Sequence, residues 1–384
     1  MLVVSLGWSL NDAHAKKAYL VTYGPGDAVW EWFGHNAIWL QDADQGLDHT
    51  FSFGYFDLEA SGFYGRFIEG EMRYFGSSVA AQREFDFYRR LNRSIRVQEL
   101  NLSDEQFDQL QRLLTQAIYP YPQYYDYDYY QANCSTWLRD LINETTNNAL
   151  AEALQSSPAQ ASFREHTANQ TRHHPAAYLG LMALLGPMVD QPITQWEEAF
   201  LPAALAEQVT QVVLPTGPLV VSDSMVYQSQ DHAMEGLVVA GPGALLAWGL
   251  ILAGLVLMPN YVRARVAWLP MGLAIAVLSV SGLMILGMMA LTAHEVVRGN
   301  LLLMVLHPFW LGLLPIWPRL WRRAAWWICL LLLIGGSVGW LSGLLGVQDG
   351  RILWLVTPVI LAILWLSHRV LWSDQNPAPS LADG

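Results

Sequence analysis

The sequence predicts an α+β domain followed by an all-α transmembrane bundle of about five helices. Two observations divide the chain in this way. First, 53% of the 384 residues are hydrophobic and only 14% are charged, whereas an ordinary soluble domain carries about a quarter charged residues. Second, four of the 33 acidic residues and eight of the 21 Lys and Arg residues lie beyond residue 237, so the front part carries a net charge of −16 and the rear part +4.

The class of the front part follows from the order of its expected elements. Four segments have the alternating pattern and the turn-forming neighbours of β-strands, namely 18–24, 35–42, 50–55 and 95–100. A helix is then predicted after Ser103, which forms a capping-box sequence with Gln106, and Pro120 ends it. A second helix is expected to begin near Cys134. Strands followed by helices are typical of an α+β domain.

The rear part contains five apolar stretches near the length that crosses a bilayer. A helix needs about 20 apolar residues to span the hydrocarbon. The stretches are 237–258, 267–291, 300–317, 324–345 and 352–372. Polar faces at a period of 3.6 residues, which buried helices of a soluble protein would carry, are missing from them. The stretches therefore predict transmembrane helices.

The charges between these stretches predict the orientation. Six Arg residues lie in the first loop, in the third loop or after the last span: Arg263, Arg265, Arg319, Arg322, Arg323 and Arg369. The second and fourth loops hold one each, Arg298 and Arg351. The positive-inside rule then places residue 236 and everything before it outside the cytoplasm. We expect a multi-pass protein of the bacterial inner membrane with its front domain in the periplasm.

The expected domain boundaries follow from these patterns. Ala13-His14-Ala15 has the spacing of a signal-peptidase site. We divide the chain into a signal-peptide remnant (1–15), a catalytic domain (16–150), a helical extension and linker (151–235), the transmembrane bundle (236–373) and a cytoplasmic tail (374–384). The acidic front domain argues against a nucleic-acid partner, because phosphate binding needs clustered Lys and Arg. Cys134 and Cys329 fall in different environments, so no disulfide is expected.

Cys134 and His35 are the candidate catalytic pair. A helix N-terminus lowers the pKa of a thiol, because its dipole and free N–H groups favour the thiolate. His35 begins a strand after Gly34, a position suited to presenting a base to a thiol. From these features alone, a cysteine packed in the core remains the alternative. No Cys or carboxylate joins His166, His173 and His174 at metal-ligand spacing, so no metal is expected.

Several blocks of this sequence resemble the Lnb-type periplasmic domain family. They comprise Tyr19 to Gly26, Phe33 to Ala37, Asn92-Arg93-Ser94 before Leu100 to Ser103, Tyr127 to Asp140, Phe163-Arg164-Glu165, Phe200-Leu201-Pro202 and His307-Pro308. The resemblance extends from about residue 18 to residue 320. It implies a circularly permuted papain-like (NlpC/P60-like) thiol domain, in which the His precedes the Cys. His35 precedes Cys134 by 99 residues, in agreement with that order.

The resemblance also implies an activity, that of a lipoprotein N-acyltransferase. Such an enzyme moves an acyl chain from a phospholipid to the N-terminal amine of a diacylglyceryl-cysteine lipoprotein. Cys134 would carry the acyl chain as a thioester, and His35 would be the general base. No cofactor is expected. The rival hypothesis is a membrane-anchored periplasmic thiol peptidase or amidase that uses the same pair, and a third is a sensor or assembly factor without the chemistry.

Other residues are candidates for supporting roles. The oxyanion would be held by the Cys134 backbone N–H and a donor such as Tyr127 or Tyr23. Asn133 precedes the thiol and is a further candidate. A third residue should orient His35, and the candidates are Asn36, His49 and Ser52, although each is also explained as an ordinary polar residue on a strand.

Overall fold

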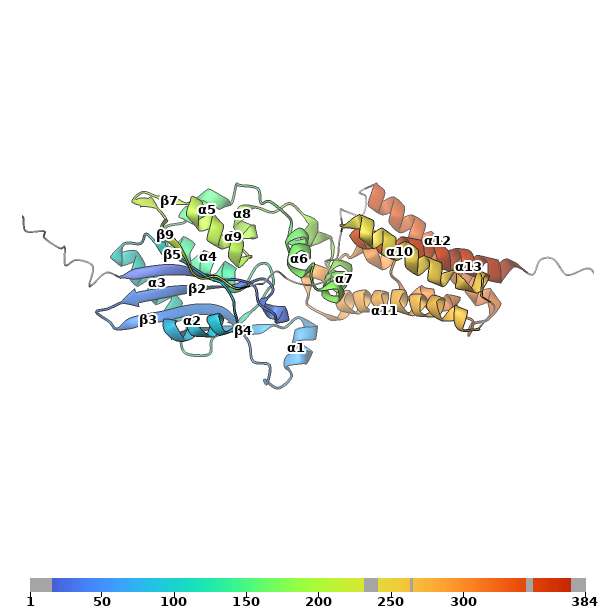
Figure 1. Cartoon of the computed structure of the whole chain (residues 1–384), viewed down its shortest axis with the longest axis horizontal. Helices are drawn as coiled ribbons and strands as arrows, with labels where there is room; N and C mark the ends of the chain where they lie inside the picture. Colours follow the sequence, from blue (N-terminus) through green and yellow to red (C-terminus); the bar gives the residue numbers. More distant parts are fainter. Residues whose placement is uncertain (1–15, 231–240, 263–264, 343–347, 374–384) are drawn as a thin grey trace, which may run out of the picture. The chain divides into compact units, whose positions relative to one another are not determined.

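The computed structural model describes residues 16–230, 241–262, 265–342 and 348–373. The chain divides into two compact units (Figure 1). Unit 1 comprises Met1–Phe163 and Pro192–Met234, and unit 2 comprises Arg164–Gln191 and Glu235–Gly384. The expected cleavage site after Ala15 and the expected tail 374–384 lie outside the described residues.

Unit 1 is built on a seven-stranded sheet in the order β6-β4-β3-β2-β1-β5-β9. All neighbouring strands are antiparallel. The strands are β1 (Lys17–Tyr23), β2 (His35–Asp42), β3 (Leu47–Tyr55), β4 (Arg73–Ala80), β5 (Ile95–Leu100), β6 (Tyr124–Asp126) and β9 (Val220–Tyr227). A short hairpin, β7 (Val213–Leu214) and β8 (Gly217–Pro218), stands beside the sheet. The prediction of an α+β domain is confirmed.

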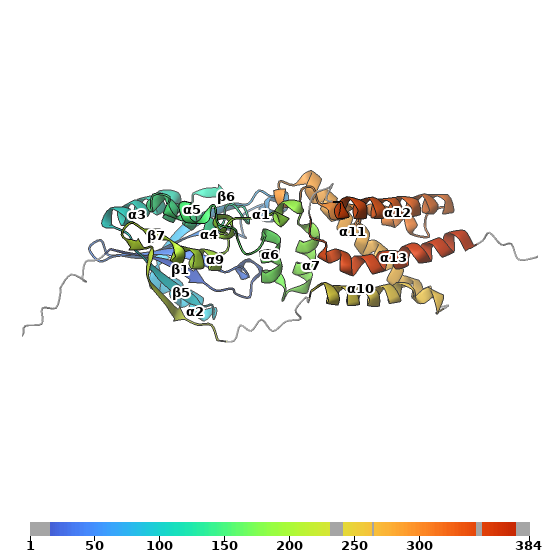
Figure 2. The ribbon, with the colours of Figure 1, turned by 90° about the horizontal axis from the view of Figure 1, so that it is seen from above.

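Helices cover both faces of this sheet (Figure 2). The helices of this unit are α2 (Ala81–Arg90), α3 (Asp104–Ile118), α4 (Cys134–Thr145), α5 (Ala149–Leu154), α8 (Gln195–Glu198) and α9 (Pro202–Gln208), with short 3-10 turns at Val29–Glu31 and Val209–Gln211. A further helix, α1 (Phe63–Glu69), has no buried residue. The expected capping box is present, since the Ser103 side chain accepts from the Gln106 backbone N–H.

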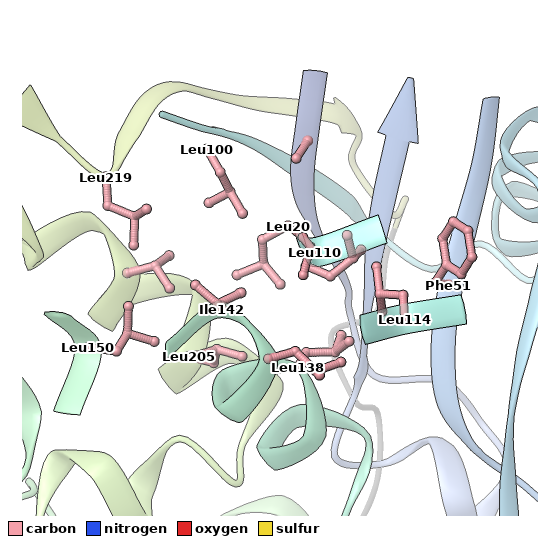
Figure 3. Close-up of a cluster of buried hydrophobic side chains, with 14 of the residues drawn as sticks. Leu20, Phe51, Leu100, Leu110, Leu114, Leu138, Ile142, Leu150, Leu205 and Leu219 are labelled. Carbon is pink, nitrogen blue, oxygen red and sulfur yellow. The ribbon is translucent and has the colours of Figure 1, made fainter. Parts of the chain in front are cut away.

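Successive side chains of a strand point to opposite faces of the sheet, and each face has its own core. Leu20 and Ile38 pack with Leu110 of α3 and Leu138 of α4 in the larger cluster (Figure 3). On the other face, β1 and β2 pack against Phe85 and Tyr88 of α2 through a smaller cluster. The larger core holds α4 against the strands, and α4 begins at Cys134.

The prediction that residues 151–235 form a helical extension and linker is partly wrong. Residues 220–227 form β9, which pairs with β5 at the edge of the sheet. Arg96 of β5 forms an ion pair with Asp223 of β9 at 2.7 Å. This pairing joins residues more than a hundred positions apart, so local patterns did not reveal it. Residues 164–191, which we had placed in the extension, belong to unit 2.

Unit 2 is helical. Its α-helices are α6 (Phe163–Thr171, in unit 2 from Arg164 on), α7 (Pro175–Leu184), α10 (Pro242–Val256), α11 (Leu269–Leu291), α12 (Arg319–Leu341) and α13 (Arg351–Trp372). Its 3-10 turns are Pro187–Asp190, Met258–Asn260, Arg265–Trp268, Glu295–Val297, Leu301–Met304 and Pro308–Leu313. The Arg164 guanidinium is buried and joins α6 to the segment after α7 through an ion pair with Asp190 at 2.7 Å.

The expectation of about five transmembrane helices needs correction. Among the described residues, three helices are long and apolar enough to cross a membrane: Arg265–Leu291, Arg319–Leu341 and Arg351–Trp372. Helix α10 has 15 residues, which is short of the required length. The stretch 300–317 contains 3-10 turns instead of an α-helix. Pro308 contributes to this break, because proline lacks the N–H that a helix interior requires.

The irregular stretch lies between α11 and α12. A Cβ on Gly282 of α11 would lie 2.4 Å from the Leu306 carbonyl oxygen, and one on Gly312 would lie 2.6 Å from the Ala325 Cβ. These glycines allow close approach of the backbones. His307 is 2% exposed there, so protein surrounds its side chain. Non-helical backbone at membrane depth is tolerated where protein surrounds it.

The two ends of unit 2 differ in charge. At one end, Arg319 and Arg323 donate to the carbonyl oxygens of Val370 and Leu371, and Arg369 donates to Asn260. At the other end, α7 is held by Asn300 and Gln348, whose amides donate to carbonyl oxygens at Ala183, Leu184 and Leu185. The Arg residues on which the predicted orientation rests, as far as the structure describes them, thus gather at the end of unit 2 away from α7.

Candidate active site

Cys134 is the first residue of α4, and Asn133 caps that helix. The Asn133 Oδ1 accepts from the backbone N–H groups of Ser135 and Thr136 at 2.9 and 3.0 Å. Its Nδ2 donates to the carbonyl oxygens of Tyr129 and Phe200, both at 2.9 Å. Both amide hydrogens of Asn133 are thus engaged with carbonyl groups. This residue positions the thiol, and its side chain is not an available oxyanion donor.

The start of α4 is fastened to β2 next to His35. The Ser135 hydroxyl donates to Asn36 Oδ1 at 2.9 Å, and the backbone N–H of Asn36 is hydrogen-bonded to the Cys134 thiol. Because Asn36 follows His35 in the chain, these contacts bring the two expected catalytic positions into one place. Asn36 Nδ2 donates to Thr22 Oγ1 at 2.8 Å. Its side chain therefore fixes α4 and β1, where we had considered it for orienting His35.

His35 enters β2 from a tight turn. Gly34 has a φ of +83°, and a Cβ there would lie 2.8 Å from the Tyr23 carbonyl oxygen, so only glycine fits. The imidazole of His35 is surrounded by tyrosine rings, with centroids at 6.2 Å for Tyr23, 6.4 Å for Tyr55 and 6.3 Å for Tyr88. Tyr23 in turn stacks on Tyr88 at 3.6 Å.

Burial controls the ionisation of both groups. It raises the pKa of the Cys134 thiol to about 11, although hydrogen bonds from the backbone N–H groups of Asn36, Ser135 and Cys134 itself oppose the rise. Burial, together with the charge of Arg93, lowers the pKa of His35 to about 3. Our expectation that the helix N-terminus lowers the thiol pKa is therefore wrong for this state, because desolvation outweighs the N–H groups. At neutral pH the site holds a thiol and a neutral imidazole.

Arg93 is a charged residue of the site that the sequence did not reveal. It is 3% exposed, its Nε donates to the Gly24 carbonyl at 2.7 Å, and its Nη1 lies 3.2 Å from Glu31. Its Nη2 is buried without a hydrogen-bond partner among the described residues. The positive charge of Arg93 contributes to the low pKa of His35 and opposes the rise in the pKa of Cys134. The block Asn92-Arg93-Ser94 was visible in the sequence, but nothing in it indicated burial.

An aromatic wall borders the thiol on the side of β3. Gly54 has a φ of +96°, and a Cβ there would lie 3.5 Å from the Cys134 Cβ and 3.8 Å from the Tyr127 ring. Tyr127 stacks on Tyr74 with centroids 4.3 Å apart. Burial raises the pKa of Tyr127 well above its usual value, so the phenol stays protonated and can donate a hydrogen bond.

The two other orienting candidates lie elsewhere or bind other groups. His49 Nδ1 is 3.2 Å from the Ser78 hydroxyl, and His49 pairs with Leu40, five positions along β2 from His35. The Ser52 hydroxyl lies 3.0 Å from the Tyr55 hydroxyl. Ser52 thus reaches the site only through Tyr55. Burial raises the pKa of Glu84 to about 7, and its charge acts on the buried tyrosines Tyr23, Tyr55 and Tyr88.

Within the described residues, no group of three or more His, Cys, Asp or Glu side chains is placed to hold a metal ion.

Residues 6–169 match the family described as the Lnb N-terminal periplasmic domain. This range contains His35, Arg93 and Cys134, and it is shorter than the resemblance noted in the sequence. Comparisons with curated proteins and with solved structures found no match. The family indicates a lipoprotein-processing enzyme, and the three candidate membrane helices indicate that it is anchored in a membrane. The chain therefore contains an Lnb N-terminal periplasmic domain over residues 6–169.

Proposed function

We propose that this protein is a lipoprotein N-acyltransferase of the bacterial inner membrane that works through a Cys134 thioester. The carrying observation is the half-buried thiol at the start of α4, hydrogen-bonded to the Asn36 backbone N–H beside His35, within an Lnb-type domain. A thiol at a helix N-terminus against an antiparallel sheet, with the His earlier in the chain, also supports a circularly permuted papain-like domain. The acyl donor is a phospholipid, and the acceptor is a diacylglyceryl lipoprotein.

In the first half-reaction the thiol becomes acylated. His35, which is neutral because burial lowers its pKa to about 3, takes the thiol proton as the thiolate attacks an ester carbonyl of the phospholipid. The C–S bond forms and the carbonyl becomes an oxyanion. When the oxyanion collapses, the ester C–O bond breaks and His35 returns the proton to the departing lysophospholipid. Because the thiol has a pKa of about 11, we propose that its proton moves to His35 during the attack. A thiolate–imidazolium ion pair that exists before the attack fits this pKa less well.

The oxyanion needs donors that are already in place. The Cys134 backbone N–H stands at the start of α4, and the protonated Tyr127 borders the thiol. Arg93 adds a buried positive charge whose Nη2 has no partner among the described residues. A charge of this kind is worth most in a site shielded from water.

In the second half-reaction the lipoprotein accepts the acyl chain. The neutral α-amine of the diacylglyceryl-cysteine attacks the thioester, the C–N bond forms, and the C–S bond breaks. His35 takes the excess proton from the amine and returns it to the Cys134 thiolate. The resting thiol and imidazole are thereby restored, so the cycle needs no cofactor.

The arrangement of unit 2 supports an inner-membrane location with the catalytic domain in the periplasm. The described Arg residues of the expected cytoplasmic side gather at one end, as the positive-inside rule requires. We propose that this end faces the cytoplasm and that the α7 end faces the periplasm. Both proposed substrates then lie in the bilayer that unit 2 occupies.

The test is expression of the full chain in a strain that lacks its own lipoprotein N-acylation, followed by mass spectrometry of lipoprotein N-termini. We expect an added amide-linked acyl chain. Failure of the wild-type protein to add one overturns the function, and release of a cleaved peptide instead would favour the peptidase hypothesis.

The donor is tested with the purified full chain in vesicles that carry a phospholipid with an isotope-labelled acyl chain. We expect the label first on Cys134, as a thioester released by hydroxylamine, and then on the lipoprotein amine. An unlabelled amide product would show that the chain came from another ester, such as the lipoprotein's own diacylglyceryl group. That result would overturn the phospholipid donor but not the thioester.

A further inference from the structure

Helix α1 and the turn beside it carry an unusual number of exposed apolar side chains. We call this set the α1 surface: Val29, Trp30, Leu58, Tyr64, Phe67 and Ile68, which are 63, 61, 42, 68, 40 and 64% exposed. None of the residues of α1 is buried. Soluble proteins rarely expose large contiguous apolar patches unless the patch binds something.

The α1 surface is one connected feature of unit 1. Trp30 contacts Phe56 edge-on with centroids 5.9 Å apart, and Phe56 stacks on Phe63 of α1 at 5.6 Å. Gly62 and Gly70 flank α1 with φ values of +74° and +87°. These left-handed residues end the helix sharply on both sides, so α1 projects as a separate element (Figure 1).

Aromatic rings connect this surface with the thiol. Phe56 contacts Tyr74 at 5.1 Å, and Tyr74 stacks on Tyr127 at 4.3 Å. Tyr127 and the Cys134 Cβ both border Gly54. A series of ring contacts therefore links the exposed helix to the residues that border the nucleophile, entirely within unit 1.

We propose that the α1 surface docks into the interface of the lipid bilayer. The chain itself supplies the argument for this partner, because three of its helices are long and apolar enough to span a membrane and so keep unit 1 near one. The surface is rich in Trp, Tyr and Phe, which concentrate at membrane interfaces because one end of each ring system tolerates water. A short amphipathic helix with such a face lies in the interface plane.

The charges around α1 define the kind of membrane contact. Residues 57–71 contain Asp57, Glu59, Glu69 and Glu71 against Arg66 alone. A net negative charge gives no attraction to anionic lipids. Docking is therefore driven by apolar burial, and it should occur on zwitterionic lipid and persist at high salt.

The path to Cys134 gives the docking a role that rests on the proposed function. An acyl chain of a lipid below the α1 surface would enter along Phe56, Tyr74 and Tyr127 and present its ester carbonyl to the thiol. The docking itself does not depend on acyl transfer, so the two are tested separately.

The test measures the depth of a probe on α1 in the full chain, reconstituted in zwitterionic phosphatidylcholine vesicles. Cys134→Ser and Cys329→Ser remove the native thiols, and Ile68→Cys carries an environment-sensitive fluorophore. The matched control is Phe87→Cys on α2, which is 47% exposed but outside the α1 surface. Because such helices lie about 5–10 Å below the surface, a lipid nitroxide near the headgroup should quench the probe at 68 at least about twofold more than the probe at 87.

A second variant separates docking from chance proximity. With the fluorophore at Leu58→Cys, the combined change Tyr64→Ser, Phe67→Ser and Ile68→Ser should abolish quenching, whereas Phe87→Ser should leave it intact. Equal quenching at 68 and 87, or quenching at 58 that survives the triple change, overturns the proposal. Depth quenching without any acyl transfer by the wild type would instead leave docking intact and overturn the proposed function.

Discussion

The two cysteines of the chain occupy helices of opposite character. Cys134 stands at the N-terminus of α4, where the Asn133 side chain caps the backbone N–H groups of Ser135 and Thr136. The backbone N–H of Asn36 is hydrogen-bonded to the Cys134 sulfur. Cys329 lies inside α12, fully buried, where the backbone N–H groups bond to the preceding turn. Both thiols are free.

The difference teaches that a thiol's surroundings matter as well as its exposure, since Cys134 is half-buried and Cys329 is buried. Cys134 is surrounded by an imidazole, a guanidinium and N–H groups that can stabilise a developing charge, whereas Cys329 has apolar neighbours in an apolar helix. What matters is which groups are buried with the sulfur. The predictions below test this contrast.

The largest expected effect is the loss of Cys134. Cys134→Ala should lower kcat/KM for acyl transfer by about four orders of magnitude or more, because the covalent route disappears. Cys329→Ala is the matched control and should leave the rate within about threefold. Acylation is measured by mass spectrometry of the lipoprotein product. Equal effects of the two changes would contradict the assignment.

Replacing Arg93 should have the next largest effect. Arg93→Met keeps much of the side-chain packing but removes the charge, and we expect a loss of about 10²–10³ in kcat, the size seen for one oxyanion donor. Arg93→Lys should recover part of it. The contrasting change is Arg96→Met on β5, whose guanidinium pairs with Asp223, and it should leave kcat unchanged. A rise in KM with kcat unchanged would assign Arg93 to substrate binding.

The pH dependence of stability should report the buried imidazole. The folded pKa of His35 is about 3, below its ordinary value of 6.5, so the unfolded chain binds a proton that the folded chain excludes. The stability that comes from burying a neutral His35 is fully present above pH 6.5. It is lost as the pH falls from 6.5 toward 3. Limited proteolysis of unit 1 in urea should give a midpoint that falls over this range in the wild type and less in His35→Gln. If the urea midpoints of the wild type and of His35→Gln fell equally with pH, the burial of a neutral His35 would be contradicted.

The smallest expected effect concerns the cap of α4. Asn133→Ala removes an N-cap and should destabilise unit 1 by about 1–2 kcal/mol, measured as a shift of the same urea midpoint. Asn133→Asp keeps the acceptor oxygen and should recover most of the cap. Since the cap also positions Cys134, kcat should fall in the alanine variant even under conditions where the domain stays folded. Unchanged kcat would mean that other contacts suffice to hold the thiol.

Much of unit 1 was predictable because its signals are local. The strands around Ala18 and His35 show regular alternation, and the helix after Ser103 has its own cap. Strand β4 was missed, since its Gly76 and serines weaken the pattern; Gly76 is needed because a Cβ there would lie 2.7 Å from the Phe53 ring. Strand β9 was missed because its partner β5 is distant in the chain.

In unit 2, apolar length predicted three helices that are long and apolar enough to cross a membrane. It did not distinguish an α-helix from the irregular stretch 300–317, because hydropathy measures composition and ignores how the backbone packs. The close approach at Gly282 and Gly312 depends on neighbouring helices.

By itself the sequence determined the α+β class of the front domain, the apolar rear part, and the pair His35 and Cys134 as candidates. Residue types and short spacings are enough for these, because caps, alternation and apolar length act over a few residues. The tertiary structure alone decided that Arg93 joins the site, that α1 is left exposed, and that burial raises the thiol pKa. Desolvation depends on every atom around a group, and no local pattern records it.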